Sequence, residues 1–290
     1  MLMKNKLTSY IELIRPLHSI KSLVVFAPLF FNFDFNLDLY ILVTFASILF
    51  YMMSSSIYIF NDLIDLPRDK LHPIKKHRPI ASEKITTQEA KYFLSVLLLS
   101  TIAISIIFNF ELFFILLIYL IINIFYSLIL KEVFLLDMVI IATGFVLRLF
   151  AGAVVVDISL SSWIIIITFL LASFLAISKR MDNIDSINQE SSNISKIYTE
   201  RNIKSIILIL SIILVGSYIS FTMYSEIITK YNITYLPLNS VLVIIGVLRY
   251  LYIIFNTPKN YDPIAIFFGD TLLKLIFIIW IVSFYILSAL

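Results

Sequence analysis

The sequence predicts an all-α integral membrane protein, and three observations lead to this prediction. The chain has 290 residues, of which 60% are hydrophobic and only 14% charged, and its mean hydropathy is +0.99. A water-soluble domain of this composition would have too little polar surface to cover itself. The apolar residues form runs of about 18 to 25, the length of one helical membrane crossing. These runs lack the period-two alternation of barrel strands, which leaves helices as the spanning structure.

The apolar runs predict nine helical crossings within a single transmembrane domain over 1–290. The connections at 110–111 and 157–160 are very short, so the crossings on either side of each are expected to be antiparallel neighbours. Two connections are long, 61–91 and 179–203, and we expect them to carry the functional site. The nine expected crossings are 17–33, 38–60, 92–109, 111–130, 135–156, 161–178, 204–222, 237–255 and 264–289.

The distribution of Lys and Arg predicts which side of the membrane each connection faces. If the N-terminus is cytoplasmic, both long connections face the cytoplasm, and together they hold 11 of the 22 Lys and Arg residues. The connections around 32–38, 109–111 and 157–160 hold no Lys or Arg, 225–236 holds only Lys230, and all four would face outward. Loops rich in Lys and Arg remain in the cytoplasm. The sequence therefore predicts a cell-membrane protein with a polar cavity open to the cytoplasm.

The composition also excludes several classes of function. The chain has no Cys, which excludes disulfides, thiolate catalysis and cysteine metal sites. The basic residues lie between apolar runs, so nucleic acid is not an expected partner. The first apolar run lacks a small-residue cleavage pattern, and we expect no cleavable signal peptide. A homo-oligomer is compatible with all of these features.

A charged segment follows the second apolar run and begins with three aspartates at helical spacing. Asp62, Asp65 and Asp69 would line one face of a helix, with Asn61 beside them. Such a cluster of hard oxygen ligands suits Mg²⁺ bound together with a substrate diphosphate. Pro67 interrupts the helix, so we expect a bend before the third carboxylate.

Basic side chains follow the aspartates within ten residues, among them Lys75 and Arg78. Cations that hold phosphate oxygens, next to carboxylates that hold a metal, are complementary tools for a diphosphate leaving group. His72 lacks the spacing of a metal ligand, and we expect it to support the loop locally. A simpler interpretation is that these charges neutralise one another in a solvated loop that follows the positive-inside rule. The helical spacing of the aspartates favours a site.

The segment from Asn61 to Asp69 has the pattern ND-xx-D-xxx-D, and in a chain with nine crossings this resembles the UbiA superfamily of intramembrane prenyltransferases. Further stretches resemble one branch, the decaprenyl-phosphate phosphoribosyltransferases. These stretches are RPLHSIKSLVVFAPLF, HPIKKHRPIA, FYSLILKEVFLLDMVIIATGFVLRLFAG, LSSWIIIITFLLASFLAISKR and LRYLYIIF with YDPIAIFFGDTLL.

The resemblance implies an activity. That branch transfers 5-phosphoribose from phosphoribosyl diphosphate to a polyprenyl phosphate and releases diphosphate, whereas other members attach a prenyl group from an allylic diphosphate to a small acceptor. Those prenyltransferases carry a second aspartate motif in the loop after the sixth crossing. This chain has SKRMDNID there, where Lys179 and Arg180 precede Asp182. Two cations at that place favour a phosphate group over a second metal.

The resulting hypothesis gives each residue a role. Asp62, Asp65 and Asp69 position Mg²⁺ on the donor diphosphate with support from Asn61, and Lys75 with Arg78 stabilises the departing charge. The substrate-binding group is expected to comprise Asn61, Lys21, Lys179, Arg180 and Asp182, of which Lys21 is the weaker candidate.

Three further charged residues fall within or beside the predicted crossings. Arg148 lies deep in the fifth crossing and needs a partner, for which Asp270 in the ninth is the available opposite charge. A substrate-facing role for Arg148 is the alternative. Asp137 is either a helix cap or a site residue. A transporter or channel is the competing class of function, but it would place charges along a path through the membrane rather than on one face.

Overall fold

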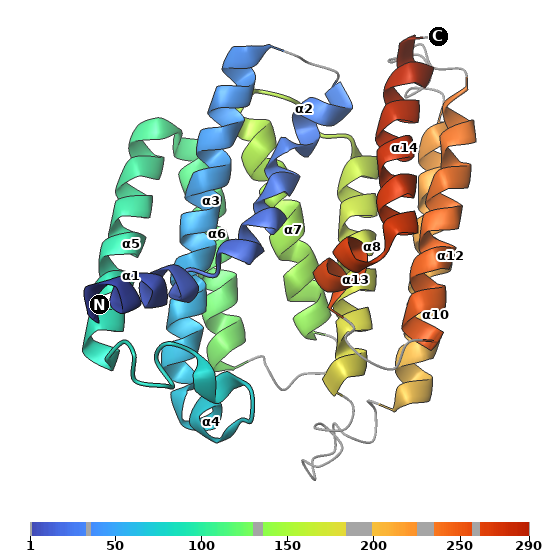
Figure 1. Cartoon of the computed structure of the whole chain (residues 1–290). Coiled ribbons are helices and arrows are strands. Elements are labelled where there is room, and N and C mark those ends of the chain that lie inside the picture. The colour runs from blue at the N-terminus through green and yellow to red at the C-terminus, as the bar shows by residue number, and fades with distance from the viewer. Residues whose placement is uncertain are drawn as a thin grey trace. The chain divides into compact units, whose positions relative to one another are not determined.

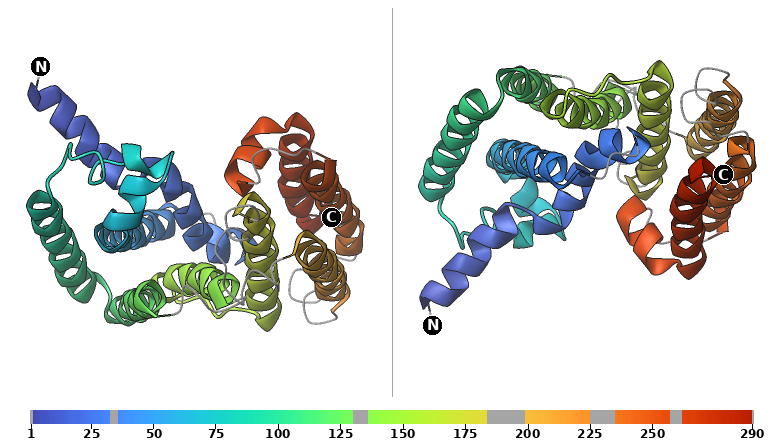
Figure 2. Two further views of the ribbon diagram at one scale, coloured as in Figure 1. Left: turned by 90° about the horizontal axis from the view of Figure 1, so that it is seen from below. Right: turned by 90° about the horizontal axis from the view of Figure 1, so that it is seen from above.

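A computed structural model describes residues 2–32, 36–129, 136–183, 199–224, 235–256 and 262–289, and in these ranges the chain contains helices and no strands. The chain divides into two compact units, and Figures 1 and 2 show their helices coloured by position along the chain. Unit 1 comprises Met1–Lys131 and Thr143–Leu160, and unit 2 comprises Glu132–Ala142 and Ser161–Leu290.

Unit 1 is built around one long helix, α3 (Leu37–Ile64), which packs against α5, α6 and η1. Asn36 caps its first turn by accepting a hydrogen bond from the Asp38 backbone N–H at 3.0 Å. The other elements are α1 (Leu2–Leu13), η1 (Pro16–Phe26), α2 (Ala27–Asn32), α4 (Leu66–Leu71), η2 (Lys75–His77), α5 (Thr87–Phe108), α6 (Phe110–Leu128) and the greater part of α7 (Leu136–Val155).

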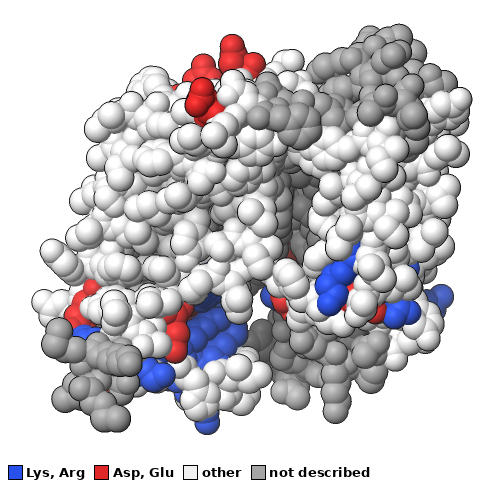
Figure 3. All heavy atoms as spheres, turned by 45° about the horizontal axis from the view of Figure 1, so that its top comes forward, with Lys and Arg blue, Asp and Glu red and all other residues white. Residues whose placement is uncertain are grey.

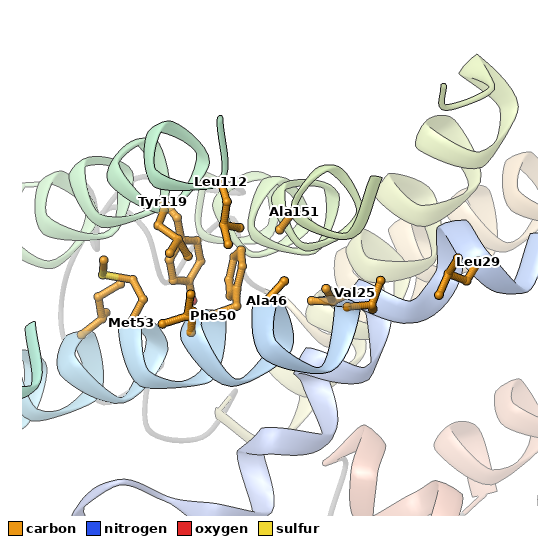
Figure 4. Packing of buried hydrophobic residues seen from close by; sticks show 12 residues of the cluster. Val25, Leu29, Ala46, Phe50, Met53, Leu112, Tyr119 and Ala151 are labelled. Atoms are coloured by element: carbon orange, nitrogen blue, oxygen red, sulfur yellow. The ribbon is translucent and has the colours of Figure 1, made fainter. Parts of the chain in front are cut away.

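The core of unit 1 forms where α3 meets α6 and α7. The rings of Phe50 of α3 and Tyr119 of α6 are in contact, with centroids 4.7 Å apart and planes tilted by 53°, and Phe50 is fully buried. Figure 4 shows these two rings next to each other, with Leu112 of α6 and Ala151 of α7 beside them. This packing fixes α3 along its length and thereby positions the residues at its C-terminal end.

The charges of unit 1 differ between the two ends of α3. The end at which α3 begins carries Asp38, and Glu111 and Asp157 lie at the turns that start α6 and follow α7. No Lys or Arg accompanies these acids among the described residues, and Figure 3 shows the isolated acidic group. The opposite end carries acidic and basic side chains together (Figure 3).

Unit 2 is a second helical bundle in which α10 packs against α8 and α12. A polar network joins α10 to α14: Tyr218 donates to Asn239 Oδ1 at 2.5 Å, and Trp280 Nε1 donates to the Tyr218 hydroxyl at 2.8 Å. The elements are α8 (Ser162–Lys179), η4 (Arg180–Asn183), α10 (Glu200–Met223), η5 (Leu236–Asn239), α12 (Ser240–Asn256), α13 (Pro263–Gly269), α14 (Thr271–Ala289) and the first turns of α7.

The predicted membrane crossings are confirmed in part. Among the described residues, eight helices are long and apolar enough to cross a membrane, and a ninth is counted if α13 and α14 form one broken span. The sequence predicted one helix over 264–289, and this was wrong, because α13 and α14 meet at an angle of 89°. Asp270 lies at the break, where its carboxylate accepts the Leu273 backbone N–H at 2.8 Å and begins a new helix.

Candidate active site

The predicted bend after α3 is confirmed, and it places the three aspartates on different elements. Helix α3 ends at Ile64, Asp65 follows with φ −82° and ψ 0°, and α4 begins at Leu66 with Pro67 in its first turn. Pro is accepted there because the first turn of a helix leaves its backbone N–H groups unpaired. Asp62 therefore lies on α3, Asp69 on α4 and Asp65 at the junction.

Asp62 and Asp69 nevertheless point to the same group. Nη1 of Arg78 donates to Asp62 Oδ1 at 3.0 Å and to Asp69 Oδ2 at 2.6 Å. Both acids are almost fully buried, with exposures of 4% and 3%, whereas the Arg78 side chain is 29% exposed. Buried carboxylates need such a partner. The structure thus brings three predicted site residues into one cluster.

Arg15 joins this cluster and was missed by the sequence analysis. Its Nη2 donates to Asp62 Oδ1 at 2.5 Å, and its guanidinium lies 4.8 Å from the centre of the Tyr58 ring. The Arg15 backbone is in the left-handed region with φ 52°, directly before Pro16, which turns the chain between α1 and η1. The signal in the sequence was its place at the start of RPLHSIKSLVVFAPLF, one of the stretches that carry the family resemblance.

The other predicted residues of unit 1 take separate positions. Asn61 accepts a hydrogen bond from Ser127 of α6, which ties the end of α3 to its neighbour. Lys75 is exposed on η2, and the described residues include no acid paired with it. Asp65 and Lys21 are half-buried, and each engages in an interaction of its own.

The loop around η2 is supported by its own polar groups. His72 Nδ1 accepts the backbone N–H groups of Ile74 and Lys75 at 3.1 and 3.3 Å, which confirms the predicted local role of this histidine. Lys70 donates to Glu83 at 2.7 Å on the surface, and this hydrogen bond lowers the pKa of the Glu83 carboxyl.

The cluster has the chemistry that a divalent cation requires, although only in part. Oxygens of Asp62 and Asp69 converge on a single cationic nitrogen, and carboxylate oxygens are the ligands that Mg²⁺ prefers. No group of three Asp, Glu or His side chains that could hold a metal occurs within the described part of the chain. The participation of Asp65 as a third ligand therefore stays a prediction.

Unit 2 holds the two cations that follow α8. Lys179 donates to Asp262 Oδ1 at 2.7 Å; the lysine is exposed and the aspartate is half-buried. Arg180 forms an ion pair with Asp137, which lies in the first turn of α7 and is 3% exposed. Asp182 lies in η4, but its side chain is outside the described residues, as is the segment 184–198.

The predicted pair between Arg148 and Asp270 was wrong. Arg148 donates to the Gly144 carbonyl at 2.7 Å, to Ser54 at 3.1 Å and to the Tyr119 hydroxyl at 3.2 Å, all within unit 1. Asp270 instead accepts a hydrogen bond from Arg249 at 2.7 Å in unit 2. Polar groups and aromatic rings thus take the place of the acid that the sequence led us to expect.

The sequence profile of the UbiA prenyltransferase family matches residues 22–278. The chain belongs to the UbiA prenyltransferase family. A UbiA homologue from Archaeoglobus fulgidus, solved with DMAPP and Mg²⁺, has the same fold with a TM-score of 0.71 at 20% identity, over 97% of this chain and 99% of that one.

Curated proteins with a named activity also match. The decaprenyl-phosphate phosphoribosyltransferase of Mycolicibacterium smegmatis is 31% identical over 199 residues, which cover 67% of this chain and 62% of that protein. The protein of the same name from Corynebacterium glutamicum is 33% identical over 186 residues, which cover 61% of this chain and 55% of that protein. The matched part of this UbiA protein thus spans less than two thirds of either relative.

Proposed function

We propose that this UbiA protein transfers 5-phosphoribose from phosphoribosyl diphosphate to a polyprenyl phosphate in a Mg²⁺-dependent reaction that releases diphosphate. The observation that carries the proposal is the convergence of Asp62 and Asp69 on Arg78, with Arg15 on the same carboxylate. Paired carboxylates beside paired guanidinium groups suit a metal-bound diphosphate. The choice of phosphoribose rests on the names of the curated relatives and on the Lys179–Arg180 pair.

The residues of unit 1 act on the donor. Asp62 and Asp69, with Asp65 as the third candidate, would hold Mg²⁺, which neutralises charge on the diphosphate and favours its departure. Arg78 and Arg15 present planar guanidinium groups that can donate two hydrogen bonds to phosphate oxygens. Lys75 is exposed and adds a mobile point charge. Loss of one such donor is expected to cost about 3 kcal/mol of transition-state stabilisation.

The acceptor requires no general base. A polyprenyl phosphate is already anionic near neutral pH, and its oxygen attacks C1 of the ribose as the bond from C1 to the diphosphate oxygen breaks. The diphosphate leaves with the electron pair of that bond, and attack from the opposite face inverts C1. We assign phosphate binding to Lys179 and Arg180 in unit 2, and Lys21 remains a weaker candidate.

The alternative is a prenyltransferase that moves a prenyl group from an allylic diphosphate to a small acceptor. The family description favours it, and so does the Archaeoglobus fulgidus homologue, which was solved with DMAPP and Mg²⁺. The same carboxylates and arginines would serve either donor, because both leave as diphosphate.

The deciding experiment offers the purified protein both kinds of donor. We expect label from phosphoribosyl diphosphate to appear in the lipid fraction when polyprenyl phosphate is present, and to disappear when the divalent metal is chelated. Transfer from an allylic diphosphate to a small acceptor, with no phosphoribosyl lipid formed, would reverse the assignment. D62N protein, prepared in the same way, is the control for a contaminating activity.

A further inference from the structure

Two acid–base pairs lie around the end of α8 in unit 2, and they differ in burial. The Asp137 carboxylate is almost fully buried and pairs with Arg180, whose side chain is 26% exposed. The Asp262 side chain is 33% exposed and pairs with Lys179, which is 52% exposed. The adjacent cations Lys179 and Arg180 therefore pair with carboxylates that differ in burial.

The pair between the buried Asp137 carboxylate and Arg180 is expected to exchange with solvent ions less readily than the pair between Asp262 and Lys179. Asp137 Oδ2 binds Arg180 Nη2, and Asp137 Oδ1 has no hydrogen-bond donor among the described residues. Removing a carboxylate from water is costly, and within the described part of the chain the Arg180 guanidinium is the cation that offsets this cost for Asp137. The consequence for Arg180 is that one of its nitrogens is fixed by a buried group while part of the side chain stays accessible to solvent.

We propose that Asp137 is a positioning residue that orients Arg180 to bind a phosphate group of a substrate. This inference rests on the proposed function only in assigning a phosphate to Arg180. A guanidinium has five N–H donors in a fixed fork, so a carboxylate on one part of the fork sets the direction of the rest. Asp137 acts through Arg180 and does not itself contact the phosphate.

Asp262 has the opposite effect. Its pair with Lys179 is exposed, and exposed ion pairs contribute little and exchange readily with other ions. Asp262 also caps α13, where its Oδ2 accepts the Ala265 backbone N–H at 3.3 Å. A phosphate oxygen and the Asp262 carboxylate compete for the same ammonium group, so Asp262 opposes phosphate binding whereas Asp137 supports it.

The test measures binding of inorganic diphosphate to the detergent-purified full chain by calorimetry. The titrations are made in the R78Q background, so that the cluster in unit 1 does not mask binding at Arg180. We expect D137N to weaken binding about tenfold, as one misaligned charge-assisted hydrogen bond would. R180Q should weaken it at least as much, and the matched variant D262N should tighten it a few-fold, because Lys179 loses its competing carboxylate.

Each other result overturns a defined part of the inference. Unchanged binding in D137N together with weakened binding in R180Q would end the positioning role while leaving the phosphate role of Arg180 intact. Unchanged binding in R180Q would end both. Because diphosphate belongs to phosphoribosyl and prenyl donors alike, failure of the phosphoribosyl assay does not decide this titration.

A second comparison covers the case in which D137N alone does not fold. The double variant D137N/R180Q lacks both charges of this pair and is compared with R180Q by thermal unfolding and by the same titration. Equal dissociation constants show that Asp137 acts only through Arg180. Weaker binding in the double variant than in R180Q would mean that Asp137 contributes to binding by another route.

The turnover assay uses protein in which Arg78 is retained. There D137N should raise KM for the affected substrate while kcat changes little, and D137E should recover part of the loss.

Discussion

Asp62 and Asp69 lie on different helices, yet both carboxylates accept hydrogen bonds from the same nitrogen of Arg78. The break at Asp65 brings them together, because an uninterrupted helix would have carried Asp69 along the axis of α3. A pattern of three aspartates at helical spacing thus becomes, in the structure, two convergent carboxylates and a third at the junction.

Replacing Asp62 with Asn is expected to lower kcat by at least about 100-fold, because it removes a metal ligand and a partner of two arginines. The substitution should also lower the unfolding free energy by about 2 kcal/mol, because Arg15 and Arg78 lose a charged partner. The loss is no larger because both arginine side chains keep contact with water. Turnover and thermal unfolding in detergent measure the two effects. D38N, on the exposed first turn of the same helix, is the matched control and should change neither. Full activity in D62N would contradict the metal assignment.

The Mg²⁺ requirement should separate Asp69 from Asp65. Because Asp69 shares the Arg78 nitrogen with Asp62 and Asp65 lies at the junction, D69N is expected to raise the Mg²⁺ concentration for half-maximal activity about tenfold or more. D65N should raise it less. The measurement is a Mg²⁺ titration of initial rate after chelation of bound metal. A larger shift in D65N than in D69N would show that the third carboxylate is the main ligand.

Part of this site could be predicted from the sequence. Hydropathy located the helices, and local spacing identified Asp62, Asp69 and Arg78, because these residues are close in the chain and their contacts follow from a helix and one bend. Arg15 could not be found in this way, since it reaches Asp62 across 47 residues through a left-handed turn. Contacts of that kind depend on how α1 and η1 pack on α3.

The predicted partner of Arg148 was wrong for a different reason. Sequence analysis looks for an opposite charge, and Asp270 was the one available in the ninth crossing. In the structure two hydroxyls, a carbonyl and the ring faces of Phe50 and Tyr119 surround the guanidinium, which lies 4.6 and 5.1 Å from the two ring centres. Hydroxyls and ring faces carry no formal charge, so a charge count does not reveal them.

Two substitutions of Arg148 separate the contribution of its side-chain volume to stability from the contribution of its charge. R148A should lower the unfolding free energy by about 3 kcal/mol, because it leaves a cavity beneath Phe50 and Tyr119. R148M should stay within about 1 kcal/mol, because an apolar chain of similar length fills the space and no buried charge needs a partner. Thermal unfolding in detergent compares the two. Equal losses would indicate that the core depends on the guanidinium itself.

Gly152 provides a test of helix packing in unit 1. A Cβ at Gly152 would lie 1.8 Å from the backbone carbonyl oxygen of Val25, so α7 and η1 could not keep their contact. We expect G152A to cost about 3 kcal/mol or to prevent folding. G216A is the matched control, because a Cβ at Gly216 in α10 meets nothing within 4 Å and should add up to about 1 kcal/mol of helix stability. A well-folded G152A with unchanged melting temperature would refute this packing.

The orientation of unit 1 can be tested directly, because the chain has no Cys and each introduced thiol is then the only one. Basic residues gather at the end of unit 1 that carries Arg78, whereas the described residues at the other end include acids and no Lys or Arg. The positive-inside rule therefore predicts that the Arg78 end is cytoplasmic. The exposed residues Lys76 and Glu111 lie at opposite ends. In intact cells a membrane-impermeant maleimide should label E111C at once and K76C only after permeabilisation, while the unsubstituted protein stays unlabelled. The reverse order would place the candidate site outside the cell, where a cytoplasmic sugar diphosphate could not reach it, and would remove phosphoribosyl diphosphate as the donor.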